Sequence, residues 1–191
     1  MIHYDFLVLI DLWKPEVILK DPGSGPHIKR AEASLLNYKL ILDNLRHFKF
    51  KKVIIENARL YKDSDIQPPK FILDYFNDKN IKYYVTEGRE DNMFHLFQNK
   101  CSFLIGGQNW NMCVHGRHYG LVNTFYSGHE VFSSPLITIR EENILYSLIN
   151  GNDYDLDTKL SWSKTSDAYV WKVDYIREKT LLDWTGKNLA K

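Results

Sequence analysis

Short apolar runs alternate along this chain with segments of helical periodicity. Continuous apolar runs at residues 4–10, 52–56, 81–86 and 102–105 predict strands that are buried on both faces. A fifth run, at residues 132–139, is interrupted by Pro135. Apolar residues spaced three and four apart predict a helix over residues 31–47. Further helices are predicted over residues 70–77, 92–98 and 141–149.

Strands that alternate with helices predict an α/β fold, with a mainly parallel sheet in three layers and helices on both faces. In such a sheet the carboxyl ends of the strands share one edge, where ligands usually bind. Asp11, Asn57, Glu87 and Cys113 each follow a predicted strand. We therefore expect these four residues to meet at this edge and to form a site.

The last forty residues are harder to interpret. Residues 151–157 are polar and predict a loop, while residues 168–174 alternate like a strand. We interpret residues 151–191 as an edge strand or arm on a single domain that spans residues 1–191. Its tryptophans, Trp162, Trp171 and Trp184, are either core residues or a packing or dimer surface.

The composition is that of an ordinary soluble globular protein. Of the 191 residues 44% are hydrophobic and 26% are charged, and 25 basic side chains balance 24 acidic ones. This balance gives no field that would recruit nucleic acid or an anionic membrane. The basic cluster at residues 49–52 is interpreted as a solvated loop between a helix and a strand. The start of the chain and its apolar runs favour a cytoplasmic protein without a membrane span.

The segment from Leu104 to Leu121 carries the most chemical information. Its apolar strand breaks at Gly106 and Gly107 and is followed by helical periodicity around Cys113. A thiol in the first turn of a helix meets unpaired N–H groups and the positive end of the dipole, which favour the thiolate. The alternative is a small buried side chain, because free cysteine is among the most often buried residue types.

Two motifs resemble the isochorismatase-like cysteine hydrolases, a superfamily that includes nicotinamidases and related amidases. LVLIDLW, at residues 7–13, resembles the family's first strand with its closing aspartate. LIGGQNWNMCV, at residues 104–114, resembles its strand, glycine turn and cysteine helix. Strand order and spacing agree over roughly residues 4–140. The resemblance implies the family's Rossmann-like topology.

The same resemblance implies a catalytic mechanism. Cys113 would attack a carbonyl carbon, and Asp11 would accept the thiol proton and return it to the leaving group. Backbone N–H groups near Asn111 and Met112 are candidates for stabilising the oxyanion. For Asp11 the alternative is a carboxylate that only caps a turn at the end of a strand.

The chain departs from the family pattern at the third catalytic residue. The family's lysine should follow the third strand, where this chain has TEGRED at residues 86–91. Lys82 lies at the start of that strand and would point away from the site. Arg89 is the nearest cation that could replace the lysine. Arginine keeps its proton, so Arg89 could act only through its charge or by binding a substrate carboxylate.

The sequence predicts neither a metal nor an organic cofactor. Nicotinamidases present Asp-x-His after the second strand, where this chain has Asn57-Ala58-Arg59. His115 and His118 are three residues apart, a spacing more typical of surface or core histidines than of a ligand set. Side chains predicted to line a small-molecule pocket are Trp13, Asn57, Glu87 and Trp110, although core packing also explains the aromatic ones.

Two functions remain open. The first is a cysteine-dependent hydrolase of a small amide, imide or related carbonyl compound. The second is a catalytically degenerate relative that serves as a small-molecule binding or protein-interaction module. Loss of the lysine and of the metal ligands favours the second, while Asp11 and Cys113 favour the first. A nucleotide-binding domain is weaker, because no glycine-rich fingerprint follows the first strand.

Overall fold

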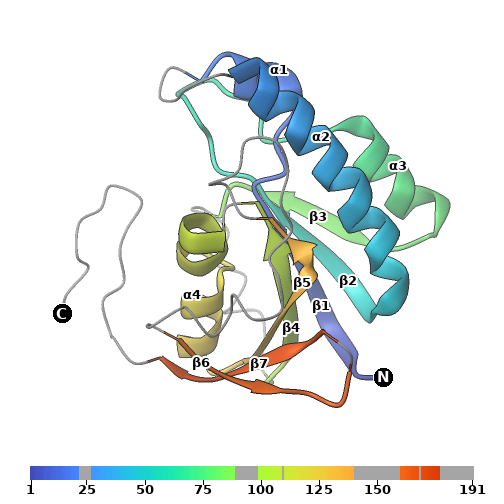
Figure 1. Ribbon diagram of the computed structural model, residues 1–191, viewed down its shortest axis with the longest axis vertical. Coiled ribbons are helices and arrows are strands. Elements are labelled where there is room, and N and C mark those ends of the chain that lie inside the picture. Colours follow the sequence, from blue (N-terminus) through green and yellow to red (C-terminus); the bar gives the residue numbers. More distant parts are fainter. Residues whose placement is uncertain (22–26, 89–98, 109, 140–159, 168, 177–191) are drawn as a thin grey trace.

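The computed structural model describes the chain except residues 22–26, 89–98, 109, 140–159, 168 and 177–191 (Figure 1). Its described strands form one seven-stranded sheet in the order β3-β2-β1-β4-β5-β7-β6. The strands are β1 (His3–Ile10), β2 (Lys49–Glu56), β3 (Tyr83–Thr86), β4 (Ser102–Gly107), β5 (Glu130–Thr138), β6 (Leu160–Lys164) and β7 (Trp171–Ile176).

Strands β1 to β5 are parallel, and β7 and β6 add to them in antiparallel pairing. The chain moves outward from β1 to β2 and β3, then returns to the other side of β1 with β4. The strand order therefore reverses between β1 and β4. In open α/β sheets, ligands bind outside the carboxyl ends of the strands at such a reversal.

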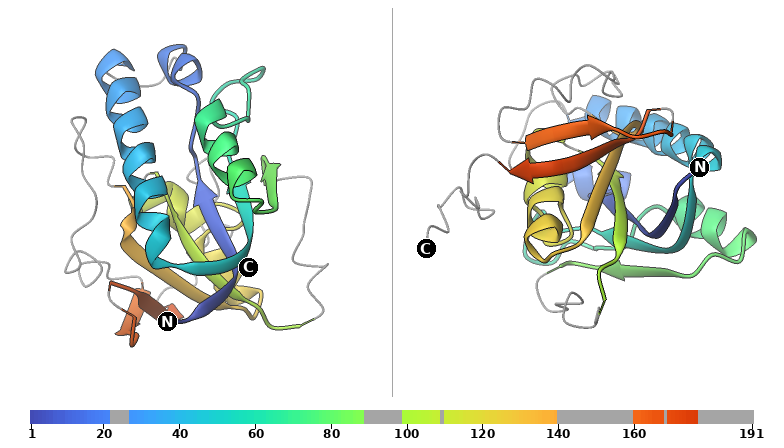
Figure 2. Two further views of the ribbon diagram at one scale, coloured as in Figure 1. Left: turned by 90° about the vertical axis from the view of Figure 1, so that its right-hand side faces the viewer. Right: turned by 90° about the horizontal axis from the view of Figure 1, so that it is seen from below.

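Helices and short helical turns connect the strands. They are α1 (Pro15–Leu19), α2 (His27–Asn44), η1 (Leu45–His47), α3 (Lys70–Asp78), η3 (Trp110–Val114) and α4 (Leu121–Tyr126). Figures 1 and 2 show α2 and α3 on one side of the sheet and α4 on the other. The α/β class and the mainly parallel sheet predicted from the sequence are thus confirmed.

Strand β1 is buried because its two faces supply two separate hydrophobic clusters. Leu7 and Leu9 belong to the cluster that contains side chains of α2 and α3. Val8 and Ile10 belong to the cluster that contains side chains of η3, α4 and β7. Since successive side chains of a strand point to opposite faces, the apolar run of β1 contributes to both.

Strand β5 contains an irregularity that brings its chain close to β4. Ile105 pairs with Ser133, but Gly107 pairs with Thr138, so residues 134–137 fall outside the ladder with β4. Pro135 lies in this segment, as expected for a proline inside a sheet. A Cβ at Gly106 would clash with the Ile137 carbonyl oxygen, so glycine allows the close approach.

Two expectations about these elements were wrong. Residues 49–52 belong to β2 rather than to a loop, since the ladder with β1 begins at Lys49. The strand predicted at residues 168–174 exists as β7, but it pairs with both β5 and β6 and is not an edge. The edge strand on that side is β6, a short segment at which no strand was predicted. The helices predicted at residues 92–98 and 141–149 lie outside the described residues.

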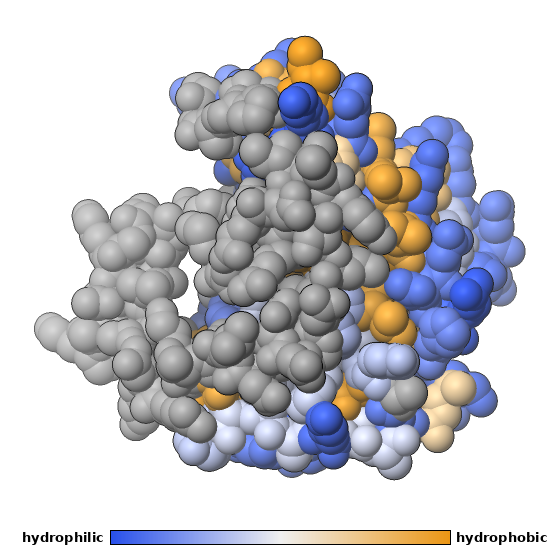
Figure 3. Space-filling view, in the orientation of Figure 1, coloured by the Kyte–Doolittle hydropathy of each residue, from blue (hydrophilic) through white to orange (hydrophobic). Residues whose placement is uncertain are grey.

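Apolar side chains also reach the surface along α2. Figure 3 shows hydrophobic colour following this helix between hydrophilic regions. Ile28 is 68% exposed and Leu36 is 51% exposed.

In the described part of the chain no helix is both long and apolar enough to cross a membrane.

Gly107 provides a test of the contact between β1 and β4. It has a φ of +124°, and a Cβ there would overlap with the backbone N and O of Ile10. We expect Gly107→Ala to lower the free energy of unfolding by about 1–3 kcal/mol for the backbone conformation alone, with a similar further loss from the overlap. Urea denaturation measures the change.

Gly128→Ala is the matched control for this substitution. Gly128 also has a positive φ, +88°, but a Cβ there would meet nothing within 4 Å. We expect only the conformational part of the loss, about 1–3 kcal/mol. Equal losses in the two variants would contradict the close approach of β1 and β4.

Candidate functional site

Asp11 is the first residue after β1 and lies at the reversal of strand order. Its φ is +59°, a left-handed conformation that few residues other than glycine adopt, although aspartate tolerates it. Its N–H donates to the Glu56 carbonyl oxygen at 2.8 Å, so the turn still pairs with β2. Such strained residues persist where the surroundings enforce them, often at functional sites.

Asn57 enforces the turn after Asp11. Its Oδ1 accepts the N–H of Leu12 at 2.7 Å, and its Nδ2 donates to the carbonyl oxygens of Leu12 at 3.2 Å and Ile66 at 2.9 Å. The side chain is fully buried. Asn57 therefore holds backbone in place, and its predicted place in a pocket wall stays a prediction.

The structure brings the Cys113 thiol and the Asp11 carboxylate together. The thiol is a hydrogen-bond partner of this carboxylate. The second carboxylate oxygen, Oδ1, accepts the N–H of Ala58 at 3.1 Å. Asp11 is completely buried, and Cys113 is 6% exposed. The two residues that the sequence singled out from opposite halves of the chain thus share one hydrogen-bonded cluster.

The helix around Cys113 differs from the expected one. Strand β4 continues through both glycines to Gly107, and η3 begins at Trp110 as a short π-helical segment. Cys113 is its fourth residue, and the first N–H, that of Trp110, donates to the Ile139 carbonyl oxygen at 3.0 Å. Activation of the thiol by the helix dipole therefore stays a prediction.

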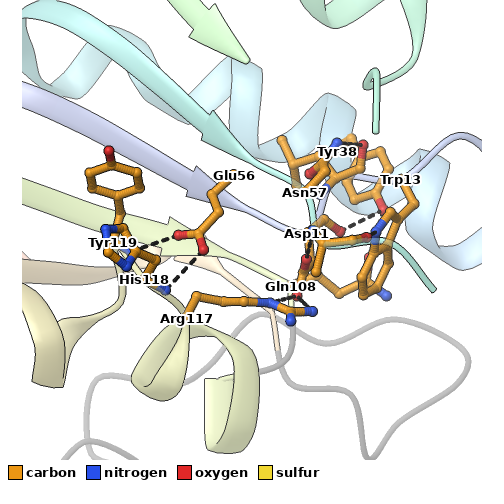
Figure 4. A network of polar contacts seen from close by, with 11 residues as sticks. Asp11, Trp13, Tyr38, Glu56, Asn57, Gln108, Arg117, His118 and Tyr119 are labelled. Carbon is orange, nitrogen blue, oxygen red and sulfur yellow. Dashed lines mark hydrogen bonds and ion pairs between the residues drawn. The ribbon is translucent and has the colours of Figure 1, made fainter. Parts of the chain in front are cut away.

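Arg117 is the main charged group that the sequence analysis missed. Its Nε and Nη2 lie 2.7 Å and 2.5 Å from Asp11 Oδ2, and the two side chains are 1% and 0% exposed (Figure 4). The spacing from Cys113 contained a signal, because residues four apart in a helix share a face. The family pattern places the cation after the third strand, so this arginine was not among the predicted site residues.

Glu56 is a second buried carboxyl at this edge. Its Oε1 accepts the N–H of His118 at 2.9 Å, and its Oε2 accepts that of Tyr119 at 2.7 Å (Figure 4). Gly88 has a φ of +82°, and a Cβ there would clash with Glu56 Oε1. The end of β2 therefore fixes the backbone directly after Arg117.

Burial raises the pKa of both carboxyl groups. For Asp11 the rise from desolvation is opposed by the charge of Arg117 and by hydrogen bonds from Cys113 and Ala58, and the pKa remains above its ordinary value. Burial raises the pKa of Glu56 from 4.5 to about 8, against the opposing effect of its N–H donors and of Arg117. A buried carboxylate with a raised pKa is a stronger base than an exposed one.

The predicted pocket residues lie in different surroundings. Trp13 is buried, its indole N–H donates to the Ala58 carbonyl oxygen at 2.7 Å, and its ring centroid lies 6.0 Å from the Arg117 guanidinium. Trp110 is buried against Trp162, at 5.7 Å between ring centroids. Glu87 pairs with Arg59 at 2.6 Å.

Three further predictions concern a cation and the oxyanion. Arg89 lies outside the described residues, so its predicted role stays untested. The backbone of Asn111 and Met112 belongs to η3, and their role at the oxyanion stays a prediction.

The two histidines of the cysteine segment lie against aromatic rings. His115 contacts Trp110 edge-on at 4.8 Å, and His118 contacts Tyr119 edge-on at 4.9 Å. Among the described residues, no group of three or more His, Cys, Asp or Glu side chains is placed to hold a metal ion. Neither Cys101 nor Cys113 forms a disulfide.

Comparisons with models of protein families, with curated proteins and with solved structures gave no match. The resemblance to isochorismatase-like hydrolases therefore stays a prediction.

The buried ion pair predicts a specific pattern of stability. Arg117→Met leaves the buried Asp11 carboxylate without its cation, so we expect a loss of about 3–5 kcal/mol in the free energy of unfolding. Adding Asp11→Asn removes that isolated charge, so the double variant should be more stable than Arg117→Met alone. Urea denaturation of the three proteins measures both differences.

An exposed ion pair provides the control. Lys70 pairs with Asp74 at 2.6 Å, with side chains 84% and 45% exposed. Lys70→Met should change stability by less than about 1 kcal/mol. If the double variant were less stable than Arg117→Met, the Asp11 carboxylate would be stable in the folded protein without the Arg117 cation. This result would contradict the prediction.

Glu56 predicts how stability changes with pH. Between pH 4.5 and about 8 the folded protein keeps a proton on Glu56 that the unfolded chain releases. Stability therefore falls as the pH rises through this window, by up to about 1.4 kcal/mol per pH unit. In Glu56→Gln this part of the slope should disappear, as measured by urea denaturation at several pH values.

Glu130→Gln is the control for the pH experiment. Its side-chain hydrogen bond to Lys172 lowers the pKa of Glu130, so its stabilising contribution is lost only on acidification. This variant should keep the fall in stability at higher pH. Identical slopes in wild type and Glu56→Gln would contradict the raised pKa of Glu56.

Proposed function

We propose that this protein is a divergent isochorismatase-like cysteine hydrolase that cleaves a small amide, imide or related carbonyl compound. The observation that carries the proposal is the hydrogen bond between the Cys113 thiol and the buried Asp11 carboxylate. A nucleophile within hydrogen-bond reach of its base is the arrangement that covalent catalysis requires. Its place at the reversal of strand order, where small ligands bind in open sheets, also supports the proposal.

In the proposed reaction, Asp11 takes the thiol proton as Cys113 Sγ bonds to the carbonyl carbon of the substrate. The carbon–nitrogen bond then breaks, and Asp11 returns the proton to the leaving nitrogen, which gives a thioester on Cys113. Water attacks the thioester and transfers a proton to Asp11. The carbon–sulfur bond breaks, the product leaves as a carboxylic acid, and the thiol regains its proton.

The left-handed backbone of Asp11 supports a functional role for this residue. A glycine at this position would adopt a φ of +59° without strain, and an aspartate there must be held by its surroundings. The side chain of Asp11 accepts hydrogen bonds from Ala58, Arg117 and Cys113. All these interactions use the carboxylate, which glycine lacks.

The finer structural predictions belong to the same proposal. The parallel order β3-β2-β1-β4-β5 is consistent with a three-layer, Rossmann-like topology. The ligand is a small molecule, and neither nucleic acid nor a membrane takes part. A cytoplasmic location and a homo-oligomer stay predictions.

One observation favours the second function, a degenerate binding or interaction module. Cys113 is only 6% exposed, and Arg117 is 2% exposed. A cluster so enclosed also suits a structural network that holds the loops at the sheet edge. Such a module would bind a small molecule or a protein without using the thiol.

Substitution of Cys113 separates the two functions. We expect the wild-type protein to release ammonia from acetamide or benzamide, or to open succinimide, and Cys113→Ser to lose this turnover because it lacks the thiol. Asp11→Asn should lower turnover by about 10²–10⁴-fold, the usual contribution of a positioned base. Circular dichroism checks that each variant is folded.

Cys101→Ser is the matched control. Cys101 directly precedes β4 and so lies at the opposite edge of the sheet from Cys113. We expect this variant to keep full activity. Activity that survives in Cys113→Ser would reject the cysteine mechanism, and binding that survives without any turnover would favour the module.

A further inference from the structure

Cys113 and Arg117 reach Asp11 from one turn of the chain. The N–H of Arg117 donates to the carbonyl oxygen of Cys113 at 3.0 Å, a bond between residues four apart. This turn places both side chains on the Asp11 carboxylate. The thiol hydrogen-bonds to it, and the guanidinium donates a hydrogen bond to Oδ2 through Nε, with Nη2 in ion-pair contact with the same oxygen.

The charge of Arg117 is permanent and enclosed. Arginine does not lose its proton in proteins, and its side chain here is 1% exposed. The guanidinium also lies 6.0 Å from the centroid of the Trp13 ring. In surroundings that exclude water, a cation stabilises nearby negative charge far more than it does at the surface.

Glu56 and Gly88 hold this cation in place. Glu56 accepts the N–H groups of His118 and Tyr119, the two residues that follow Arg117. Gly88 leaves the space that the Glu56 carboxyl occupies. The carbonyl oxygen of Arg117 accepts a bond from Asn123 Nδ2 at 2.9 Å. The backbone around Arg117 is therefore held by the end of β2 and by α4.

We propose that Arg117 is the fixed cation of this site and stabilises the Asp11 carboxylate and the Cys113 thiolate together. This inference rests on the proposed function, and it assigns to Arg117 the part for which the resemblance expects a lysine on the third strand. Because a guanidinium cannot give up a proton, Asp11 is the only proton carrier of the reaction. Arg117 is a positioning residue, since it acts through Asp11 and Cys113.

Several groups share the surroundings of this cation. Tyr38 from α2 donates to the Asp11 carbonyl oxygen at 3.4 Å, and Glu56 comes from β2. The titratable and charged groups that interact with the Asp11 carboxylate are Cys113, Arg117, Tyr38 and Glu56. Among the described residues bonded to this carboxylate, Arg117 alone carries a positive charge.

The test measures the Cys113 thiolate directly. Ultraviolet absorbance of the thiolate is followed against pH, and the curve of the same protein with Cys113→Ser is subtracted. This readout needs no reagent to reach the thiol. The midpoint of the curve reports how strongly the surroundings favour the thiolate, which a purely structural role of Arg117 would leave unchanged.

We expect the midpoint to follow the charges around the thiol. Arg117→Gln should raise it by about one pH unit or more, because the cation is lost. Arg117→Lys should restore most of the difference, because it keeps the charge. Asp11→Asn should lower the midpoint, because the thiolate then faces the cation without a competing carboxylate. Arg89→Ala tests the alternative cation, and Lys70→Gln, at the exposed ion pair of Lys70 with Asp74, is the control that should leave the midpoint unchanged.

A double variant covers the case in which Arg117→Gln does not fold. Asp11→Asn with Arg117→Gln leaves no unpaired carboxylate, and circular dichroism confirms its fold. Its midpoint should lie about one pH unit or more above that of Asp11→Asn alone, since the two differ only in the cation.

The outcomes separate this inference from the proposed function. If Asp11→Asn shifts the midpoint but Arg117→Gln does not, either alone or combined with Asp11→Asn, the inference is overturned and the proposed function stands. A midpoint that responds to Arg89→Ala but not to Arg117 would overturn it in favour of Arg89. A midpoint close to that of an ordinary cysteine, about 8.5, and indifferent to Asp11 and Arg117, would overturn both.

Discussion

The ion pair between Arg117 and Asp11 is the interaction on which the carboxyl edge of the sheet depends. Both side chains are withdrawn from water, and an isolated charge there would cost several kcal/mol. Each therefore requires the other. Because Asp11 ends β1 and Arg117 follows the cysteine helix, this requirement joins two segments that are 106 residues apart in the sequence. The Cys113 thiol is placed by the same connection.

The backbone around the pair is shaped to permit it. Asp11 adopts a left-handed conformation, and Asn57 fixes the following residue through its amide. Gly107 lets β4 approach β1, and Gly88 makes room for Glu56. These are local costs in conformation, and the two hydrophobic clusters on the faces of β1 supply the stability that tolerates them. The two packed hydrophobic clusters thus stabilise the polar contacts at the carboxyl edge of the sheet.

The chemistry of such a site differs from that of one built around a lysine. A lysine can shift its pKa and exchange a proton, whereas a guanidinium contributes a fixed charge in a planar fork. The fork here places two nitrogens on a single carboxylate oxygen, Asp11 Oδ2. The other oxygen accepts the Ala58 N–H. Proton transfer in the proposed reaction therefore falls to Asp11 alone, with its basicity set by burial against the opposing charge of Arg117.

The sequence by itself determined the buried parts of the parallel strands, since apolar runs such as that of β1 are recognisable wherever two faces must be buried. It also indicated Asp11 and Cys113, because residues that follow parallel strands share one edge. Only the tertiary structure decided that Arg117 reaches Asp11 and that Glu56 holds the next two residues. These contacts join positions far apart in the chain, and no local periodicity encodes them. The edge strand β6 was likewise decided by pairing with β7, because the apolar–polar alternation of LSWSK extends over only five residues.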